Sequence, residues 1–414
     1  MRTVALALSL VLNFMIPWEG VIRVAGLGSG VKIMGFVLAS FWLATVLVTK
    51  QLRKPGLFHI VAIIFVLWNA VSIFWSENPN RSLAHVITWA QLLLLAFIWW
   101  DLYTTRTAVL AGLQAYILGA YVSIGSAISN FLAGKVFYDH YQRYSAGETN
   151  PDGFGFILAL GIPVAWYLAN SKNALRNSPW LRFINYAYIP LAFFGIALSG
   201  TRTALIASIF GMLYGLISLS RVKIWVRATI LALIVVSVLY FIVPYVQDLR
   251  SFERLGTTTT ELTEGDLNNR TNNWKEGFDA FLEHPLLGIG TNMYPTINRW
   301  GKAAHNSFIA VLVELGAIGF LIFIGLLAVA FAETWRQPRW QALFWSSVLL
   351  VWMLGSSTLT WTHRKTTWLF MSLLVANAAL FVPRAEGVRR EETLPLLPPN
   401  EPEIKAIPQA RPSR

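Results

Sequence analysis

Apolar segments close to the length that crosses a bilayer recur along almost the whole chain. A transmembrane helix needs roughly 20 mostly apolar residues, and about twelve segments reach or approach that length. They are residues 4–17, 31–48, 58–74, 83–100, 108–131, 154–168, 184–198, 204–219, 230–246, 307–332, 342–354 and 367–382. Inside a bilayer the backbone finds no water to bond, so such segments form helices. The sequence therefore predicts an all-α polytopic membrane protein with about twelve transmembrane helices.

The composition supports this fold class. Hydrophobic residues make up 55% of the chain and charged residues only 13%, and the mean hydropathy is +0.53, outside the usual range of soluble globular proteins. Arg2 precedes the first apolar run, as in a signal peptide, but no clear small-residue cleavage site follows, so we expect an uncleaved first helix. The chain has no cysteine, which excludes disulfides and thiolate chemistry.

Basic residues in the loops predict the orientation, since cytoplasmic loops are enriched in Lys and Arg. The larger set, expected in the cytoplasm, is Lys50, Arg53, Lys54, Arg106, Lys172, Arg176, Arg182, Arg221, Lys223, Arg227, Arg336 and Arg339. The smaller set, expected outside, is Arg23, Lys32, Arg81, Lys135, Arg143, Arg202, Arg364 and Lys365. Both termini are then cytoplasmic. The net charge of +12 is explained by this topology and by contacts with anionic membrane lipid, so it predicts no nucleic-acid partner.

The spans and loops divide the chain into four parts. Residues 1–246 hold transmembrane helices 1–9, including a modest outer loop at 133–153. A large outer loop follows at 247–304, and helices 10–12 occupy 305–382. Residues 383–414 are rich in proline and charge, and we expect a disordered cytoplasmic tail.

His305 is the candidate catalytic residue, because it opens an apolar helix at the end of the large polar loop. A histidine has an ordinary pKa that suits proton transfer near neutral pH. The positive end of a helix dipole favours the neutral imidazole, which is the form that a general base requires. Asn306, the next residue, is a possible supporting residue.

Three arginines on the outer side are candidates for binding an anion. Arg202 follows a helix-breaking Ser199-Gly200 pair, and the flanking threonine hydroxyls and the exposed amides of a helix start favour an anion site over a purely topological arginine. Arg270 shares a predicted helical face with the aromatic residues Trp274, Phe278 and Phe281, which would pack against the membrane domain, and Trp274 is a possible supporting residue. Arg143 lies among aromatic residues, either to clamp an anionic headgroup or as an interfacial arginine.

Three further residues have possible supporting roles. His363 and Arg364 lie in a basic cluster in the last outer loop. Glu314 would lie about 180° around a helix that starts at His305 and about 13 Å along it, so it cannot orient that imidazole directly. A carboxylate inside a span needs a partner, either a structural one on another helix or one in an acceptor path.

Three motifs, in this order, resemble the O-antigen ligase and O-antigen polymerase superfamily of bacterial envelope enzymes. They are SGTRTA, then NNRTNNWKEGF with HPLLGIG, then AHNSFIAVLVELGAIG. The resemblance covers roughly residues 143–319 in motif and the whole chain in topology. It implies a GT-C-type glycosyltransferase of the bacterial inner membrane with a periplasmic active site, no metal and no cofactor. The donor would be an undecaprenyl-diphosphate-linked glycan, bound at its diphosphate by Arg202, Arg270 and, on a weaker match, Arg143, with His305 essential.

Elementary chemistry agrees with this resemblance. Loss of a diphosphate leaving group requires neutralisation of its charge, which guanidiniums provide. The acceptor hydroxyl loses a proton, a task for a neutral His305. The sequence shows no DxD pair and no His/Asp/Glu cluster at metal-ligand spacing, which disfavours a metal-dependent mechanism. Direct displacement at the anomeric carbon would invert its configuration.

Four functions remain open at this point. The first is ligation of O-antigen to lipid A-core, which suits one dominant outer loop. The second is a polymerase of O-antigen or exopolysaccharide, which more often has two sizeable outer loops. A protein O-glycosyltransferase is the third. The fourth is a lipid-linked glycan flippase, which predicts charges through the midplane and repeat symmetry.

Overall fold

The computed structural model describes residues 1–24, 28–138, 142–171, 178–218, 225, 270–298 and 300–381. Three predicted parts lie outside these residues: the ninth span at 230–246, the first part of the large outer loop at 247–269, and the tail at 383–414.

The eleven other predicted spans each coincide with a helix. These helices are α1 (Arg2–Met15), α2 (Gly30–Thr49), α3 (Leu57–Val71), α4 (Pro79–Leu102), α5 (Arg106–Leu132), α6 (Pro151–Asn170), α7 (Pro179–Ser199), α8 (Arg202–Ser218), α14 (Ser307–Trp335), α15 (Arg339–Ser356) and α16 (Lys365–Ala378). In the described part of the chain, seven helices are long and apolar enough to cross a membrane. The all-α multi-pass architecture is confirmed, and the count of twelve stays a prediction.

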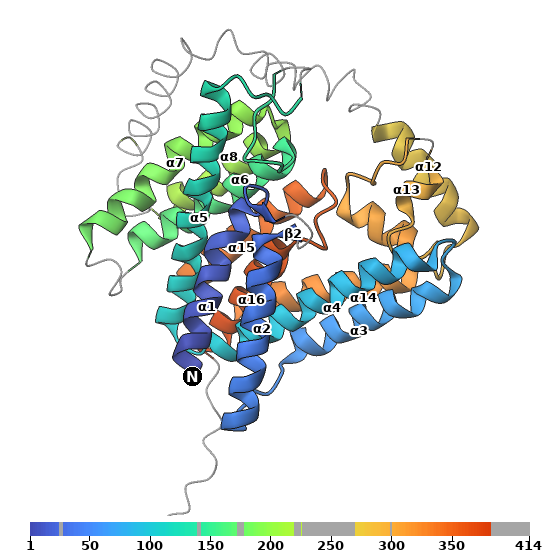
Figure 1. Cartoon of the computed structure of the whole chain (residues 1–414), viewed down its shortest axis with the longest axis horizontal. Coiled ribbons are helices and arrows are strands. Elements are labelled where there is room, and N and C mark those ends of the chain that lie inside the picture. Colours follow the sequence, from blue (N-terminus) through green and yellow to red (C-terminus); the bar gives the residue numbers. More distant parts are fainter. Residues whose placement is uncertain are drawn as a thin grey trace, which may run out of the picture. The chain divides into compact units, whose positions relative to one another are not determined.

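The remaining elements are short and lie between the long helices. They are η1 (Ile16–Trp18), η2 (Ser72–Trp75), the antiparallel pair β1 (Arg23–Val24) and β2 (Gly28–Ser29), α12 (Arg270–Glu283) and α13 (Tyr294–Ile297). Helices α12 and α13 lie in the second part of the segment predicted to be the large outer loop, and Figure 1 shows them beside one end of α14.

Helix α6 is central in the packing. It contacts α5, α7, α8 and α15, and 83% of its most apolar window is buried. By contrast, only 22% of the corresponding window of α2 is buried, so most of α2 faces the bilayer. Helices α1, α2 and α5 lie side by side, as do α3, α4, α14 and α16 (Figure 1). A helix that is apolar on all sides is suited to burial among other helices. The packing of α6 therefore also fixes the position of its first turn.

Contacts between loops join residues predicted to lie on the same side of the membrane. On one side the guanidinium of Arg2 donates to the Asp101 carboxylate at 2.7 Å. On the other side Lys365 Nζ donates to Glu19 Oε1 at 2.5 Å, and Ser82 Oγ donates to the carbonyl of Thr291 at 2.8 Å. Arg2 begins α1 and Glu19 follows its end, so these two charged contacts lie at opposite ends of α1. The orientation of the chain in the membrane stays a prediction.

Helix α14 is broken at Gly316, where the sequence predicted one continuous helix. Gly316 has φ +66° and ψ −173°, so the helical hydrogen bonding stops there. Residues 285–290, which we call the paired turn, bond to both sides of this break. Ile289 N and Gly290 N donate to the carbonyls of Val313 and Glu314 at 3.1 and 2.8 Å. In return, the amides of residues 317 and 318 donate to the carbonyls of residues 285 and 286 at 2.8 and 3.3 Å.

Two glycines allow this close approach of backbones. A Cβ on Gly288 would lie 2.4 Å from the amide nitrogen of Gly316, and a Cβ on Gly316 would lie 2.2 Å from the carbonyl oxygen of Leu286. Both residues also have positive φ, which L side chains adopt at a cost. One glycine of each motif, Gly288 of HPLLGIG and Gly316 of ELGAIG, is therefore explained by one contact between the two motifs.

Gly316→Ala is expected to destabilise the protein, because the added Cβ overpacks the contact with the paired turn. Overpacking typically costs about 1 to 3 kcal/mol. Gly325→Ala in the same helix is the matched control, since a Cβ there meets nothing within 4 Å and alanine favours a helix. Thermal unfolding in detergent should show a lower Tm only for Gly316→Ala. Equal Tm values for the two variants would contradict the pairing.

Candidate functional site

His305 lies just outside α14, at the bend that leads into it. The N-cap is Asn306, whose Oδ1 accepts from the amides of Phe308 and Ile309 at 2.9 and 3.1 Å. The supporting role predicted for Asn306 is thus a helix cap. His305 has φ +50°, an uncommon conformation for a residue with a side chain, so its surroundings hold it in place. Since the helix starts at Ser307, the angle estimated between His305 and Glu314 does not apply.

Helix α12 holds the chain immediately before His305. Asn273 Nδ2 donates to the carbonyl of Ala303 at 3.0 Å, and Trp274 Nε1 donates to the carbonyl of Ala304 at 2.7 Å. Trp274, predicted as a supporting residue, thus contributes a hydrogen bond next to the candidate base. The two bonds fix the backbone on the N-terminal side of His305.

The buried face of α12 differs from the predicted one. Asn273 and Gly277 are the buried residues of this helix, and Phe281 packs with Tyr294 against α14. Phe278 is 44% exposed, so its predicted place on the packed face is wrong. The small Gly277 decides the register, because the Tyr294 ring occupies the space that a Cβ would take.

A second brace holds the chain on the other side of His305. Ser307 Oγ donates to the carbonyl of Leu359 at 2.7 Å and accepts from the amide of Trp361 at 2.9 Å. The Trp361 ring packs on Phe156 of α6, with ring centroids 4.4 Å apart. The last outer loop therefore connects the start of α14 to the first turns of α6.

Arg143 is 3% exposed and joins three segments of the chain. Its Nε donates to the carbonyl of Ser199 at 2.7 Å. Its Nη2 donates to Asp152 Oδ1 at 2.5 Å and to Thr201 Oγ1 at 3.1 Å. The outer loop, the first turn of α6 and the α7–α8 hairpin meet at this guanidinium. The side chain is therefore enclosed by protein, and both the diphosphate contact and the interfacial alternative for Arg143 stay predictions.

Arg202 is the first residue of α8 and is half-buried. The neighbouring Thr201 is buried, and its hydroxyl donates to the carbonyl of Pro151 at 3.0 Å and accepts from Arg143. That hydroxyl therefore forms hydrogen bonds within the protein, whereas we predicted from the sequence that it faces an anion. The predicted break before Arg202 is present, with Gly200 in the left-handed conformation at the end of α7.

The candidate cations and His305 influence one another electrostatically. Burial lowers the pKa of Arg270, and the charges of Arg143 and Arg202 lower it further, while Asp152 opposes the shift. Burial also lowers the pKa of His305, Arg270 lowers it further, and Asp152 again opposes. His305 therefore favours the neutral imidazole, as predicted, but through burial and a neighbouring arginine. We call these five residues the outer charge cluster.

Asp152 is the member of this cluster that the sequence analysis missed. In the sequence it stands within Asn150-Pro151-Asp152-Gly153, a pattern typical of a turn. The structure puts it in the first turn of α6, where a carboxylate also interacts favourably with the helix dipole. An acidic residue at a helix start shortly after a candidate anion-binding arginine was the available signal.

Glu314 has a structural partner on another helix. Its Oε1 accepts from the amide of Tyr294, the first residue of α13, at 3.1 Å. This bond matches the structural alternative for Glu314 and holds α13 against α14.

His363 and Arg364 lie apart from each other's partners: His363 lies next to His85, and Arg364 belongs to a group of charged residues around Glu19. The His363 ring lies 5.0 Å from that of His85, and burial holds the pKa of His363 well below its usual range. Arg364 is exposed at the start of α16, and its positive charge is balanced partly by Glu19, which is bonded to Lys365.

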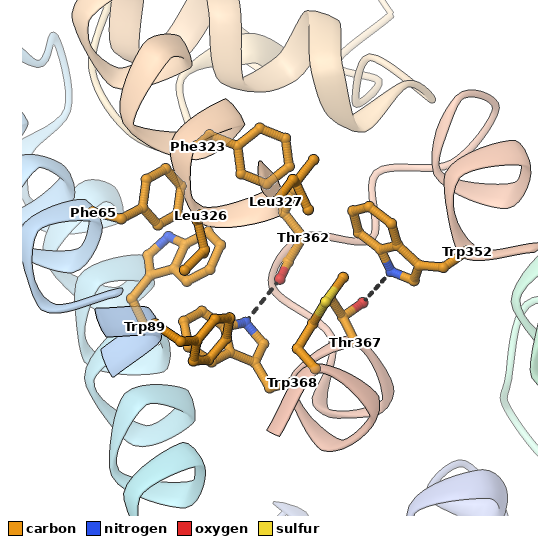
Figure 2. A pocket seen from close by; sticks show the side chains of 11 residues that line it. Phe65, Trp89, Phe323, Leu326, Leu327, Trp352, Thr362, Thr367 and Trp368 are labelled. Carbon is orange, nitrogen blue, oxygen red and sulfur yellow. Dashed lines mark hydrogen bonds between the residues drawn. The ribbon is translucent and has the colours of Figure 1, made fainter. Parts of the chain in front are cut away.

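Figure 2 shows an apolar pocket between α3, α4, α14, α15 and α16, lined by residues such as Phe65, Trp89 and Phe323. Two of its indole N–H groups are bonded within the protein: Trp368 Nε1 donates to the carbonyl of Thr362, and Trp352 Nε1 donates to Thr367 Oγ1. The buried Nε1 of Trp89 has no hydrogen-bond partner among the described residues. None of the outer charge cluster lines it. Within the part of the chain that the structure describes, no three His, Asp or Glu side chains gather as metal ligands would.

Two comparisons with known proteins bear on this site. A family model described as O-antigen ligase matches residues 187–324, a range that contains Arg202, Arg270 and His305. The chain is also 22% identical to the exopolysaccharide production protein ExoQ of Rhizobium meliloti (strain 1021), over 75% of this chain and 74% of that protein. Together they confirm the resemblance that the sequence motifs predicted.

Asp152→Asn is expected to destabilise the protein strongly, because it leaves the buried Arg143 guanidinium without its carboxylate. Breaking a buried pair by removing one partner costs about 3 to 5 kcal/mol. Glu333→Gln is the matched control, since its partner Arg336 is exposed and such pairs contribute about 1 kcal/mol or less. Thermal unfolding of the two variants in detergent measures the difference. Similar Tm losses in both would show that the Asp152 pair is not special.

Proposed function

Because the chain belongs to the O-antigen ligase and polymerase superfamily, we propose that it is a multi-pass glycosyltransferase of the bacterial inner membrane. It transfers a glycan from undecaprenyl diphosphate to an acceptor hydroxyl on the periplasmic face, without metal or cofactor. The observation that carries this proposal is that α12, which begins at Arg270, bonds the backbone directly before His305, so that the charge of Arg270 acts on that imidazole. There an arginine both supplies positive charge and favours the neutral form of the adjacent histidine.

The charge of the cluster suits a diphosphate. Three guanidiniums and the carboxylate of Asp152 leave two net positive charges, and a glycan-linked lipid diphosphate carries about two negative charges at neutral pH. Arg202 and Arg270, which are half-buried, bind the donor in this proposal. Arg143 and Asp152 are positioning residues, since they hold each other and the α7–α8 hairpin. Positive charge placed where the leaving group develops its negative charge stabilises the transition state.

His305 acts as the general base. Its neutral imidazole takes the proton of the acceptor hydroxyl as that oxygen bonds to the anomeric carbon of the donor. The bond from that carbon to the diphosphate oxygen breaks, and the electron pair leaves with undecaprenyl diphosphate. A single displacement of this kind inverts the anomeric configuration, so retention in the product would contradict it.

The acceptor distinguishes two forms of the proposal. The matched family description favours ligation, with lipid A-core as the acceptor. The relative from Rhizobium is named for exopolysaccharide production, which favours polymerisation with a second carrier-linked glycan as the acceptor. We place ligation first, because the matched family range contains three members of the outer charge cluster.

Reconstitution tests the proposal directly. Purified protein in liposomes receives undecaprenyl-diphosphate glycan and, in separate reactions, lipid A-core or further donor, with a chelator and no nucleotide. Transfer to lipid A-core alone identifies a ligase, and chain extension alone identifies a polymerase. No transfer to either acceptor, with folded protein and intact donor, would overturn the proposed function.

His305→Ala should reduce turnover by about 10² to 10⁴, the usual contribution of a general base.

Arg202→Ala and Arg270→Ala should weaken donor use, seen as a higher KM or lower kcat/KM for the donor at saturating acceptor. Lys275→Ala is the control, because Lys275 is exposed on the same helix as Arg270. Donor kinetics in both arginine variants that match those of Lys275→Ala would contradict the diphosphate assignment.

The acid limb of the pH profile should move when Arg270 is neutralised. The base works only when neutral, so activity falls as pH drops through the His305 pKa, which burial and Arg270 hold below the usual value. Arg270→Gln removes one cause of that shift, raises the pKa and moves the fall in log(kcat/KM) to higher pH. Lys302→Gln should move it the same way but less, because Lys302 has a smaller effect. A shift to lower pH in Arg270→Gln would contradict the assignment of His305 as base.

A further inference from the structure

Helix α12 has three chemically different sides. At 100° per residue, Asn273, Gly277 and Phe281 fall on the side that packs against the protein. Asp279 and Glu283 are exposed on a charged side. The third side carries Phe278 and Leu282, which are 44% and 72% exposed. A helix that lies between protein and water is expected to carry polar residues on its exposed side, so this exposed apolar side needs another explanation.

The apolar side of α12 continues beyond the helix onto a membrane-spanning one. The paired turn that follows exposes Leu286 and Leu287, and its backbone is bonded to α14 on both sides of Gly316. The next residues of α14 expose Ile318 and Leu321. We call these six side chains the apolar stripe: Phe278, Leu282, Leu286, Leu287, Ile318 and Leu321.

The break in α14 indicates the level of the membrane surface. From residue 317 to Trp335 the helix measures about 28 Å at 1.5 Å per residue, which is close to the thickness of the hydrocarbon core. Ile318 and Leu321 then lie at its outer end. Non-helical backbone at this depth requires internal hydrogen bonds, and the four bonds between the paired turn and α14 supply them.

We propose that α12 is an interfacial helix whose apolar stripe is inserted into the acyl chains of the outer leaflet. The occupant is the bilayer because the exposed apolar residues of α12 and the paired turn lead to those of α14, a helix long and apolar enough to cross a membrane. The charged side of α12, with Lys275 and Asp279 next to the stripe, faces the headgroups and water, as in other helices that lie in the membrane plane. Figure 1 shows α12 beside the end of α14 that carries the paired turn.

The depth of two neighbouring residues tests this arrangement without reference to enzymatic activity. The natural chain has no cysteine, so Leu282→Cys and Glu283→Cys each give one labelling site, 100° apart around α12. Each variant is spin-labelled and reconstituted into liposomes of phosphatidylethanolamine and phosphatidylglycerol. Collisions of the label with oxygen, which concentrates in the bilayer, and with a water-soluble nickel chelate are then measured by electron paramagnetic resonance.

The label at residue 282 is expected to collide several-fold more with oxygen than with the nickel chelate, and the label at 283 should show the reverse preference. Phe278→Cys should behave like Leu282→Cys. Free access of the nickel chelate to both residues 278 and 282 would overturn the proposal by placing the stripe in water. Protection of these labels from both reagents would also overturn it, since a protein surface or a second copy would then cover the stripe.

Discussion

Backbone hydrogen bonding near the membrane is the constraint on which the outer half of this structure depends. Helix α14 stops at Gly316, and the carbonyls and amides released there are bonded by the paired turn. This exchange is possible only where two backbones come together without side chains between them, at Gly288 and Gly316. It fixes the end of α12 on α14, and α12 in turn holds Ala303 and Ala304 before His305. The position of the candidate base, just before α14, thus depends on the backbone contact at Gly316, about ten residues further along the chain.

A buried guanidinium sets the second constraint. Arg143 could not remain charged and 3% exposed without several acceptors, and it has a carboxylate, a carbonyl and a hydroxyl. These acceptors come from segments that the sequence separates widely, so satisfying one charge brings the outer loop, α6 and the α7–α8 hairpin together. Arg202, at the start of α8, is carried into place by the same contacts. This group of positively charged residues therefore includes one acidic residue, Asp152, which is bonded to Arg143.

The sequence predicted the membrane-spanning helices well, because long apolar runs have few alternative structures. It also singled out His305, Arg202 and Arg270, because these residue types are unusual at their positions, and their functional roles stay predictions. Two kinds of feature escaped it. The break in α14 could not be predicted, because Gly316 lies in an apolar run whose other residues all favour a continuous helix and its partner is a distant turn. The packed face of α12 was misjudged at Phe278 because periodicity identifies apolar residues but not whether protein or lipid covers them.

Helix α12 connects the candidate site with the backbone contact at α14. Its first residue, Arg270, acts on the His305 imidazole through its charge, its first turns bond the backbone before His305, and the turn that follows it is bonded to α14. The arginine proposed to bind the donor and the hydrogen bonds that hold the backbone before the proposed general base therefore belong to the same helix. Preorganisation of this kind lowers the reorganisation needed in a transition state. If α12 also rests in the outer leaflet, the bilayer itself helps to set the height of both groups, which is the height at which a lipid-linked diphosphate presents its charge.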